Sequence, residues 1–321
     1  MKIHLPNSAF LGNIDPFLRT LDITNPDRLE ITTNEKWISI HPIVLSMVAA
    51  IGLTISPLKI HFKKPEATSK HYLKRMGLFT LLKIPSDIKI TEHEPAGRFI
   101  PLTQINDSSA LTKFITNMVP LLHLKPKHSE SIRYIVSELV RNALEHSLSK
   151  HGAIVSAQYY KKSNSIRIGI ADTGLGIRKT INHSHNAKSD LEAIQLALSP
   201  GITGATKKEG GTEINAGAGL FFIRSIAKVN RDYFMIYSGK AMYKLLKNKP
   251  TQKKISLHSD PFMDRFSKDE NLPFWQGTAV GIDISLETTK ELSFLLDLIR
   301  ETYTTAIKER KKAKYKKARF I

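Results

Sequence analysis

A helix predicted over residues 129–151 constrains this chain most, because polar side chains recur in it every four residues beside an apolar stripe. Glu138, Asn142 and His146 are spaced to share one side of a helix. The neighbouring stripe, predicted to be buried, consists of Ile132, Ile135, Val136, Leu139 and Ala143. A carboxylate can act as a base, an amide oxygen suits Mg²⁺, and an imidazole can donate to a phosphate. The same three residue types also occur on ordinary solvated helices, so a ligand site is indicated only together with the motifs later in the chain.

An acid and two glycines come directly after a predicted β-hairpin of residues 153–160 and 165–171. Asp172 ends the second strand, and Gly174 and Gly176 follow it. Glycines at a strand end let the backbone approach a flat ligand, and the carboxylate can accept from an exocyclic amine. A plain Asp/Gly turn is the alternative for this segment alone.

A second glycine segment opens a predicted helix at Gly217-Ala218-Gly219-Leu220. Free N–H groups and the positive end of the helix dipole make such a start a phosphate site. The preceding residues 199–216 are rich in Gly, Thr and charge, which favours a functional lid or disorder. The segment is not a dinucleotide fingerprint, because Phe222 occupies the third glycine position, and the chain has no P-loop motif.

Composition limits the remaining possibilities. A length of 321 residues suggests about two domains. The absence of Cys excludes thiolate metal sites and disulfides, and with no signal peptide or membrane span in the sequence it favours a cytoplasmic protein. The net charge of +19 permits anionic partners. Residues 301–321 form a basic helix end, with eight Lys or Arg and one acid from Lys308 to Arg319, and a solvated surface or a nucleic-acid contact both fit it.

Residues 1–110 show an alternation of strands and helices that predicts a layered α/β unit. A helix is expected to start at His41-Pro42, since Pro is tolerated in a first helical turn. The other expected elements are strands over 28–31, 37–40 and 59–62 and a helix over 72–79.

The ordered motifs from Glu138 to Gly277-Thr278 resemble those of the GHKL superfamily. That group includes gyrase B subunits, sensor histidine kinases, mismatch-repair proteins, large heat-shock chaperones and anti-sigma-factor serine kinases. The resemblance covers roughly residues 128–286 and is greatest to the anti-sigma-kinase-like branch. It implies an ATP-binding domain over residues 111–300, with a Bergerat-type two-layer α/β sandwich in which helices cover one face of a mixed sheet.

The resemblance also implies the role of each site residue. Glu138 would be the catalytic base, Asn142 would hold Mg²⁺, and residues 199–216 would be the ATP lid. The phosphates would lie against His146, Gly217, Gly219 and Leu220. The adenine would be bound by Asp172 and Thr278, with Gly174 and Gly176 shaping the wall.

The stretch of residues 25–90 resembles the STAS domain of anti-sigma-factor antagonists. Antagonists of that family carry a phosphorylated Ser or Thr at the start of the helix, whereas this chain has Ile40-His41-Pro42 there, preceded by Ser39. The resemblance therefore implies an N-terminal interaction domain for a protein partner, without chemistry of its own.

Three functions remain open at this point: an ATPase or ATP-gated regulator, a Ser/Thr protein kinase acting on a separate partner, and a non-enzymatic nucleotide-binding module whose basic tail grips nucleic acid or an acidic protein. A sensor histidine kinase is disfavoured, because no His-Glu-x-x-x-x-Pro helix precedes the motifs. His183 and His185 are expected to be ordinary loop residues rather than a metal site. The sequence leaves the oligomeric state open.

Overall fold

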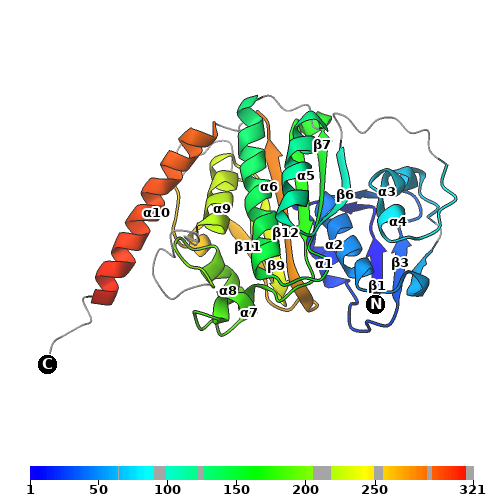
Figure 1. Cartoon of the computed structure of the whole chain (residues 1–321), viewed down its shortest axis with the longest axis horizontal. Helices are drawn as coiled ribbons and strands as arrows, with labels where there is room; N and C mark the ends of the chain where they lie inside the picture. The colour runs from blue at the N-terminus through cyan, green and yellow to red at the C-terminus, as the bar shows by residue number, and fades with distance from the viewer. Residues whose placement is uncertain are drawn as a thin grey trace.

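The computed structural model describes residues 1–63, 65–89, 99–121, 126–204, 218–248, 256–287 and 291–315. Within these ranges the chain is of the predicted mixed α/β class. Figure 1 shows a large sheet at the centre, the N-terminal elements at one side of it and the last helix at the other. In the described ranges, no helix combines the length and the apolar character needed to cross a membrane.

The central sheet has seven strands in the order β11-β10-β9-β12-β8-β7-β6. Every neighbouring pair is antiparallel, which corrects the mixed sheet implied by the resemblance. The predicted hairpin is confirmed as β7 and β8, and a turn at Lys240 joins β9 to β10; such short connections allow only antiparallel pairing. The bounds are β6 Phe99–Ile105, β7 Ala153–Tyr160, β8 Ser165–Ala171, β9 Phe234–Gly239, β10 Ala241–Leu245, β11 Phe266–Asp269 and β12 Trp275–Ser285.

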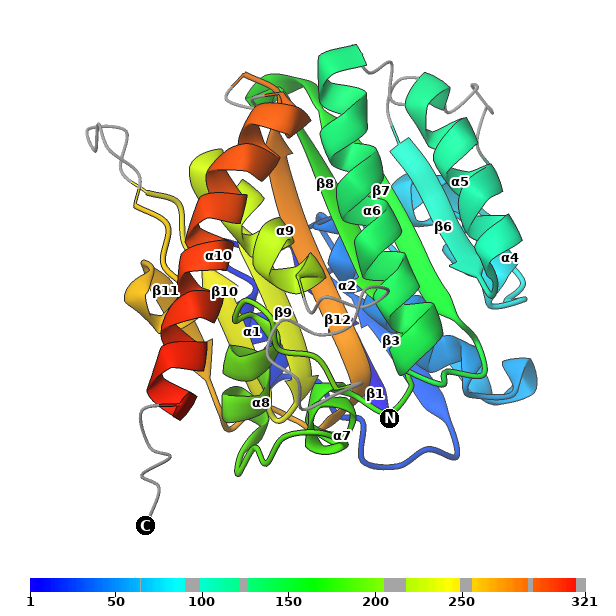
Figure 2. The same ribbon diagram turned by 60° about the vertical axis from the view of Figure 1, so that its left-hand side comes forward.

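Four long helices lie in front of this sheet, as Figure 2 shows. Alternate residues of β8, namely Ile166, Ile168 and Ile170, share a core with the apolar stripe of α6. The helices are α5 Ser108–Leu121, α6 Pro126–His146, α9 Gly219–Val229 and α10 Leu292–Tyr315.

The predicted helix over residues 129–151 is confirmed as α6, but its ends differ from the prediction. The helix starts at Pro126, a favoured first helical residue, three residues before the predicted start. It stops five residues early, because Leu148 takes a left-handed conformation with a φ of 52°. The basic helix end expected over residues 301–321 belongs to α10, which the structure describes as far as Tyr315.

The back of the sheet is covered by α2 (Pro42–Leu53), a helix of the N-terminal region, so the sheet has helices on both faces. α2 packs against β7 and β8. It approaches so closely that a β-carbon on Gly169 would lie 2.2 Å from the backbone nitrogen of Ile43. One continuous apolar core joins this helix to the back of the sheet, including Ile154, Ala171 and Tyr237.

The remaining N-terminal elements form a small parallel sheet of β1 (Lys2–Leu5), β3 (Leu29–Thr33) and β5 (Ile60–Phe62). Its strands are joined by long connections, which parallel pairing requires. The predicted helix over 72–79 is broken in two at Gly77, which has a φ of +77°. The expected domain boundary at residue 110 lies inside α5, and β6 before it already belongs to the large sheet. The smaller elements are α1 Asp15–Arg19, β2 Ser8–Ala9, β4 Ser39–Ile40, α3 His71–Arg75 and α4 Leu78–Leu81.

Two short helices complete the fold at the lower end of Figure 2: α7 (Ile177–Asn182) and α8 (Asp190–Ala197). The N-cap of α8 is Ser189, whose hydroxyl accepts a hydrogen bond from the Glu192 N–H at 3.1 Å. α7 begins directly after Gly176, so the turn that follows β8 leads straight into this helix.

Candidate functional site

A cavity of about 580 Å³ lies between α6, α7, α9 and the centre of the sheet. Six separate segments of the chain contribute its walls: residues 134–147, 170–181, 197–204 and 218–220, Ile236, and residues 278–280. Of the residues that the sequence predicts for the site, those lining the cavity are Glu138, Asn142, His146, Asp172, Gly176, Gly219, Leu220 and Thr278. Gly174 does not line it, and Gly217 lies outside the described residues. Most of the expected lid, residues 205–216, also lies outside them.

The wall formed by α6 carries the row of polar side chains that the spacing predicts, namely Glu138, Asn142 and His146. Glu138 is half-buried, and burial raises the pKa of its carboxyl group above its usual value. Arg141, whose Nη1 lies 3.3 Å from the Glu138 Oε1, opposes that rise, and Glu145 adds to it. A carboxyl group with a raised pKa holds a proton better, so Glu138 is suited to take one from a hydroxyl or a water.

The opposite end of the cavity is formed by Asp172, which is only 4% exposed. Burial raises the pKa of its carboxyl group to about 7, although hydrogen bonds from Gly174, Thr278 and Ser147 pull the pKa down. The Gly174 N–H donates to the Asp172 Oδ1 at 2.8 Å. This carboxyl group is therefore fixed in orientation while one edge of it faces the cavity.

Gly174 supports the turn from behind instead of lining the cavity. A β-carbon on Gly174 would lie 2.0 Å from the Ser147 carbonyl oxygen, which also accepts a hydrogen bond from the Leu175 N–H at 2.6 Å. Only a glycine lets the turn after β8 sit this close to the end of α6.

Gly277 and Ser238 build this end of the site; Gly277 belongs to the predicted Gly277-Thr278 motif, whereas sequence reasoning missed Ser238. Gly277, with a φ of +101°, leaves no room for a side chain, because a β-carbon would lie 2.3 Å from the Asp172 carbonyl oxygen. The Ser238 hydroxyl donates to the Gly277 carbonyl at 2.6 Å and accepts from the Ile177 N–H at 2.9 Å. No local pattern marks Ser238, because its partners are 39 and 61 residues away.

Tyr134 is a missed residue that the sequence could have shown. It lines the cavity one helical turn before Glu138, so it extends the four-residue spacing toward the N-terminus of α6. Burial raises the pKa of its hydroxyl group. The other missed lining side chains with polar atoms are Arg141, Glu145, Ser147 and Thr180, and Thr203 of the predicted lid also lines the cavity.

The N-terminus of α9 closes the cavity opposite α6. Gly219 and Leu220 lie there, and Gly219 faces both Glu138 and Asn142 without an intervening side chain. The first N–H groups of a helix have no partner within the helix, and they favour an anion. The cavity thus has an acid and an amide on one wall and a helix N-terminus on the other.

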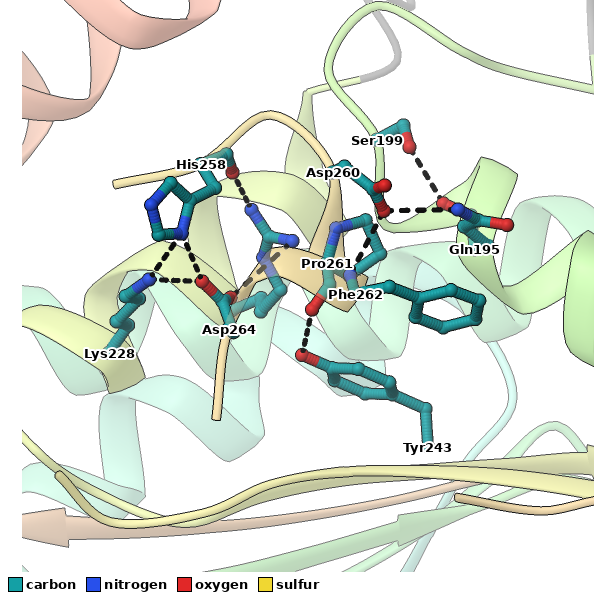
Figure 3. A network of polar contacts seen from close by, with 10 residues as sticks. Gln195, Ser199, Lys228, Tyr243, His258, Asp260, Pro261, Phe262 and Asp264 are labelled. Carbon is teal, nitrogen blue, oxygen red and sulfur yellow. Dashed lines mark hydrogen bonds and ion pairs between the residues drawn. The ribbon is translucent and has the colours of Figure 1, made fainter. Parts of the chain in front are cut away.

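The far side of α9 is held by a buried ionic cluster, shown in Figure 3. Asp264 forms ion pairs with Lys228 and with the fully buried Arg224, whose Nη1 lies 3.6 Å from the Asp264 Oδ2. His258 Nδ1 lies 3.0 Å from the Lys228 Nζ and 3.1 Å from the Asp264 Oδ1. The cluster fixes α9, and with it the wall that contains Gly219, against the segment around Asp264.

Metal-binding chemistry in the described ranges is sparse. They contain no group of three or more His, Asp or Glu side chains placed to hold a metal ion. His185 is a hydrogen-bonding loop residue as expected, with its Nε2 3.1 Å from the Thr203 carbonyl oxygen. Among the residues that line the cavity, Asn142 is the one that the sequence predicts for a cation, and its amide oxygen is a ligand type that Mg²⁺ accepts.

Comparison with known protein families and with curated proteins gives no match to this chain.

Proposed function

We propose that this chain binds Mg-ATP in the cavity between α6, α9 and the sheet and uses it as a GHKL-type regulatory ATPase. The observation that supports this most is the meeting of residues from four separated segments, Glu138 through Thr278, around one cavity. In this proposal the seven-stranded unit is a Bergerat-type domain, and the N-terminal elements are a STAS-like unit that contacts a protein partner.

Each wall suits one part of the nucleotide. Asp172 would accept a hydrogen bond from the adenine amine, with Thr278 beside it. The triphosphate would extend toward the start of α9, where Gly219 and Leu220 lie, and His146 lines the same cavity from the C-terminal end of α6. Gly219 has no side chain, so the start of α9 meets Glu138 and Asn142 through its backbone, and the free N–H groups of a helix start favour a phosphate.

Phosphoryl transfer needs a positioned acceptor and neutralisation of charge. Glu138 would orient a water or a hydroxyl and take its proton, which its raised pKa favours. Asn142 would hold the cation that the phosphates bring. Mg²⁺, when bound, would offset the negative charge that the phosphates carry.

Hydrolysis is favoured over transfer to the N-terminal unit. His41 takes the place where STAS antagonists carry their phosphorylated Ser or Thr, and it is 0% exposed. Its Nε2 lies 3.1 Å from the Asp283 Oδ1. An acceptor at this point would be enclosed between α2 and the sheet, so a kinase activity would need a separate protein.

The test combines equilibrium binding of ATP, with and without Mg²⁺, and ADP release for the wild type and three variants. Glu138→Gln should still bind Mg-ATP but release ADP at least about 100-fold more slowly, which is a usual contribution of a catalytic base. Asn142→Ala should lose Mg-dependent binding. Glu130→Gln, an exposed acid on the same helix, is the matched control and should behave as wild type. Absence of ATP binding in the wild type would reject the proposal, and normal ADP release by Glu138→Gln would reject the role of that residue.

A further inference from the structure

The last helix, α10, contacts the outside of the cavity walls. Its buried positions Leu295, Ile299 and Ala306 face the body, and α10 packs against both α9 and α6 (Figure 2). The Tyr303 ring lies against two aromatic rings of α9, with centroids 6.1 Å from Phe221 and 5.8 Å from Phe222. α10 is thus in contact with the helix that begins at Gly219.

Near its basic end, α10 also contacts the segment that follows α8, and part of this segment lines the cavity. Arg310 donates from its Nη1 to the Pro200 carbonyl oxygen at 2.6 Å. Ile202, Thr203 and Gly204, which follow Pro200 closely, line the cavity. A displacement of the end of α10 would therefore be passed through the Arg310–Pro200 contact to the neighbouring residues that line the cavity.

The end of α10 carries dense positive charge. Lys308, Lys311 and Lys312 are exposed there, and the run to Arg319 holds eight basic residues and one acid. Figure 1 shows the last turn of α10, after the Arg310 contact with Pro200, at the outer edge of the molecule. It is accessible to a large partner.

We infer that the basic end of α10 binds nucleic acid through its phosphates and that this binding is coupled to the nucleotide cavity. Residues 308–313 present charge around the helix without an apolar face, and a helix that binds a membrane surface needs one. Lysine and glutamate are depleted from protein interfaces, whereas phosphate contacts are made by Lys and Arg. The coupling rests on the proposed function; the phosphate contact does not.

Binding is tested with a labelled 24-base-pair DNA duplex and the full chain, by fluorescence anisotropy over a salt series. The expected result is an affinity that falls steeply with salt, and a slope smaller by about 2 to 3 in Lys308→Gln/Lys311→Gln/Lys312→Gln, since each lost phosphate contact removes about 0.9. The matched control, Lys150→Gln/Lys161→Gln/Lys162→Gln, neutralises three exposed lysines elsewhere and should keep the wild-type slope.

Several outcomes would overturn the nucleic-acid assignment. They are equal slopes in the two triple variants, binding to phosphatidylserine vesicles as tight as to the duplex, or binding to polyglutamate as tight as to the duplex. The last two would assign the surface to a membrane or to an acidic protein instead.

Coupling is tested by repeating the titration with saturating Mg-ATP. The duplex affinity of the wild type should change by about fivefold or more, the lower end of usual allosteric effects. Arg310→Ala removes the contact with Pro200 together with one of the eight basic charges, so it should bind the duplex slightly more weakly, and its affinity should no longer respond to Mg-ATP. An Arg310→Ala response equal to that of the wild type would overturn the route. ATP binding is measured separately, so failure of the proposed function is distinguished from failure of the nucleic-acid contact.

Discussion

Gly219 and Glu138 meet across the cavity with no space for a side chain between them. A β-carbon built on Gly219 would lie 2.7 Å from the Glu138 Oε2, and the next atom within range, Asn142 Nδ2, would be 3.8 Å away. The first turn of α9 therefore faces Glu138 and Asn142 of α6 through its backbone. The helix start that is predicted to bind phosphate thus contacts Glu138, the predicted catalytic base.

Adding one methyl group at Gly219 should displace the Glu138 carboxylate. We expect Gly219→Ala to lower ADP release about tenfold or more by moving the carboxylate, and to leave the free energy of unfolding close to that of the wild type, because the displaced atom is the far end of a flexible side chain. Gly12→Ala is the control, because its β-carbon would lie 3.3 Å from the Tyr233 hydroxyl oxygen at the end of a side chain that can move. Steady-state kinetics and urea denaturation measure both effects. Wild-type kinetics in Gly219→Ala would show that the two walls separate freely.

The protonation state of the Asp172 carboxyl group should set the affinity of the cavity for an adenine base. The pKa of this carboxyl group is about 7, so it loses its proton as the pH rises through 7. The resulting carboxylate is the stronger hydrogen-bond acceptor. We expect adenosine, which has no phosphate to titrate, to bind about tenfold more tightly at pH 8 than at pH 6. Asp172→Asn should bind more weakly than the wild type at pH 8 and show no such pH dependence. Calorimetric titration of both proteins at three pH values measures this, and a pH-independent wild type would contradict it.

His41 should make the fold less stable in mild acid. Its Nδ1 accepts from the Ile43 N–H at 3.1 Å and its Nε2 faces Asp283, so the neutral ring with a proton on Nε2 satisfies both contacts. Burial lowers the pKa of His41 even though Asp283 opposes that change. The unfolded chain therefore takes up a proton more readily than the folded one, and stability is lost as pH falls through the unfolded value of about 6.5.

The measurement is urea denaturation between pH 8 and pH 5. His41→Asn keeps an N-cap side chain without a titrating ring, so it should lose less stability than the wild type between pH 7 and pH 5. His61→Gln, which changes an exposed histidine on β5, should retain the wild-type pH profile. Parallel profiles for His41→Asn and the wild type would rule out His41 as the source.

Asp264 is predicted to contribute far more to the free energy of unfolding than an acidic residue on the surface. Asp264→Asn would leave the buried Arg224 and Lys228 without their carboxylate, at a cost of about 3–5 kcal/mol. Asp297→Asn removes an exposed acid 3.3 Å from Arg300 and should cost less than about 1 kcal/mol. Chemical denaturation compares the two variants, and equal costs would mean that the cluster behind α9 is not desolvated.

Local patterns in the sequence were sufficient for the elements that carry most of the site. The four-residue spacing predicts that Glu138, Asn142 and His146 share a helix face, and the alternation from Ser165 to Ala171 predicts a strand ending at Asp172. Both follow from the fixed periods of helix and strand, which a single segment contains in full. The glycines after Asp172 similarly indicate a tight turn, because their conformational freedom is a property of the residue itself.

The tertiary structure decided which of these segments meet. It brings Ser147 behind Gly174, Ser238 under Gly277, and Gly219 against Glu138, and it covers the back of the sheet with α2. It also makes every pair in the seven-stranded sheet antiparallel and joins β6 to it. None of these contacts has a period or a spacing along the chain. They depend on how whole surfaces pack, and many residues far apart in sequence determine that packing together.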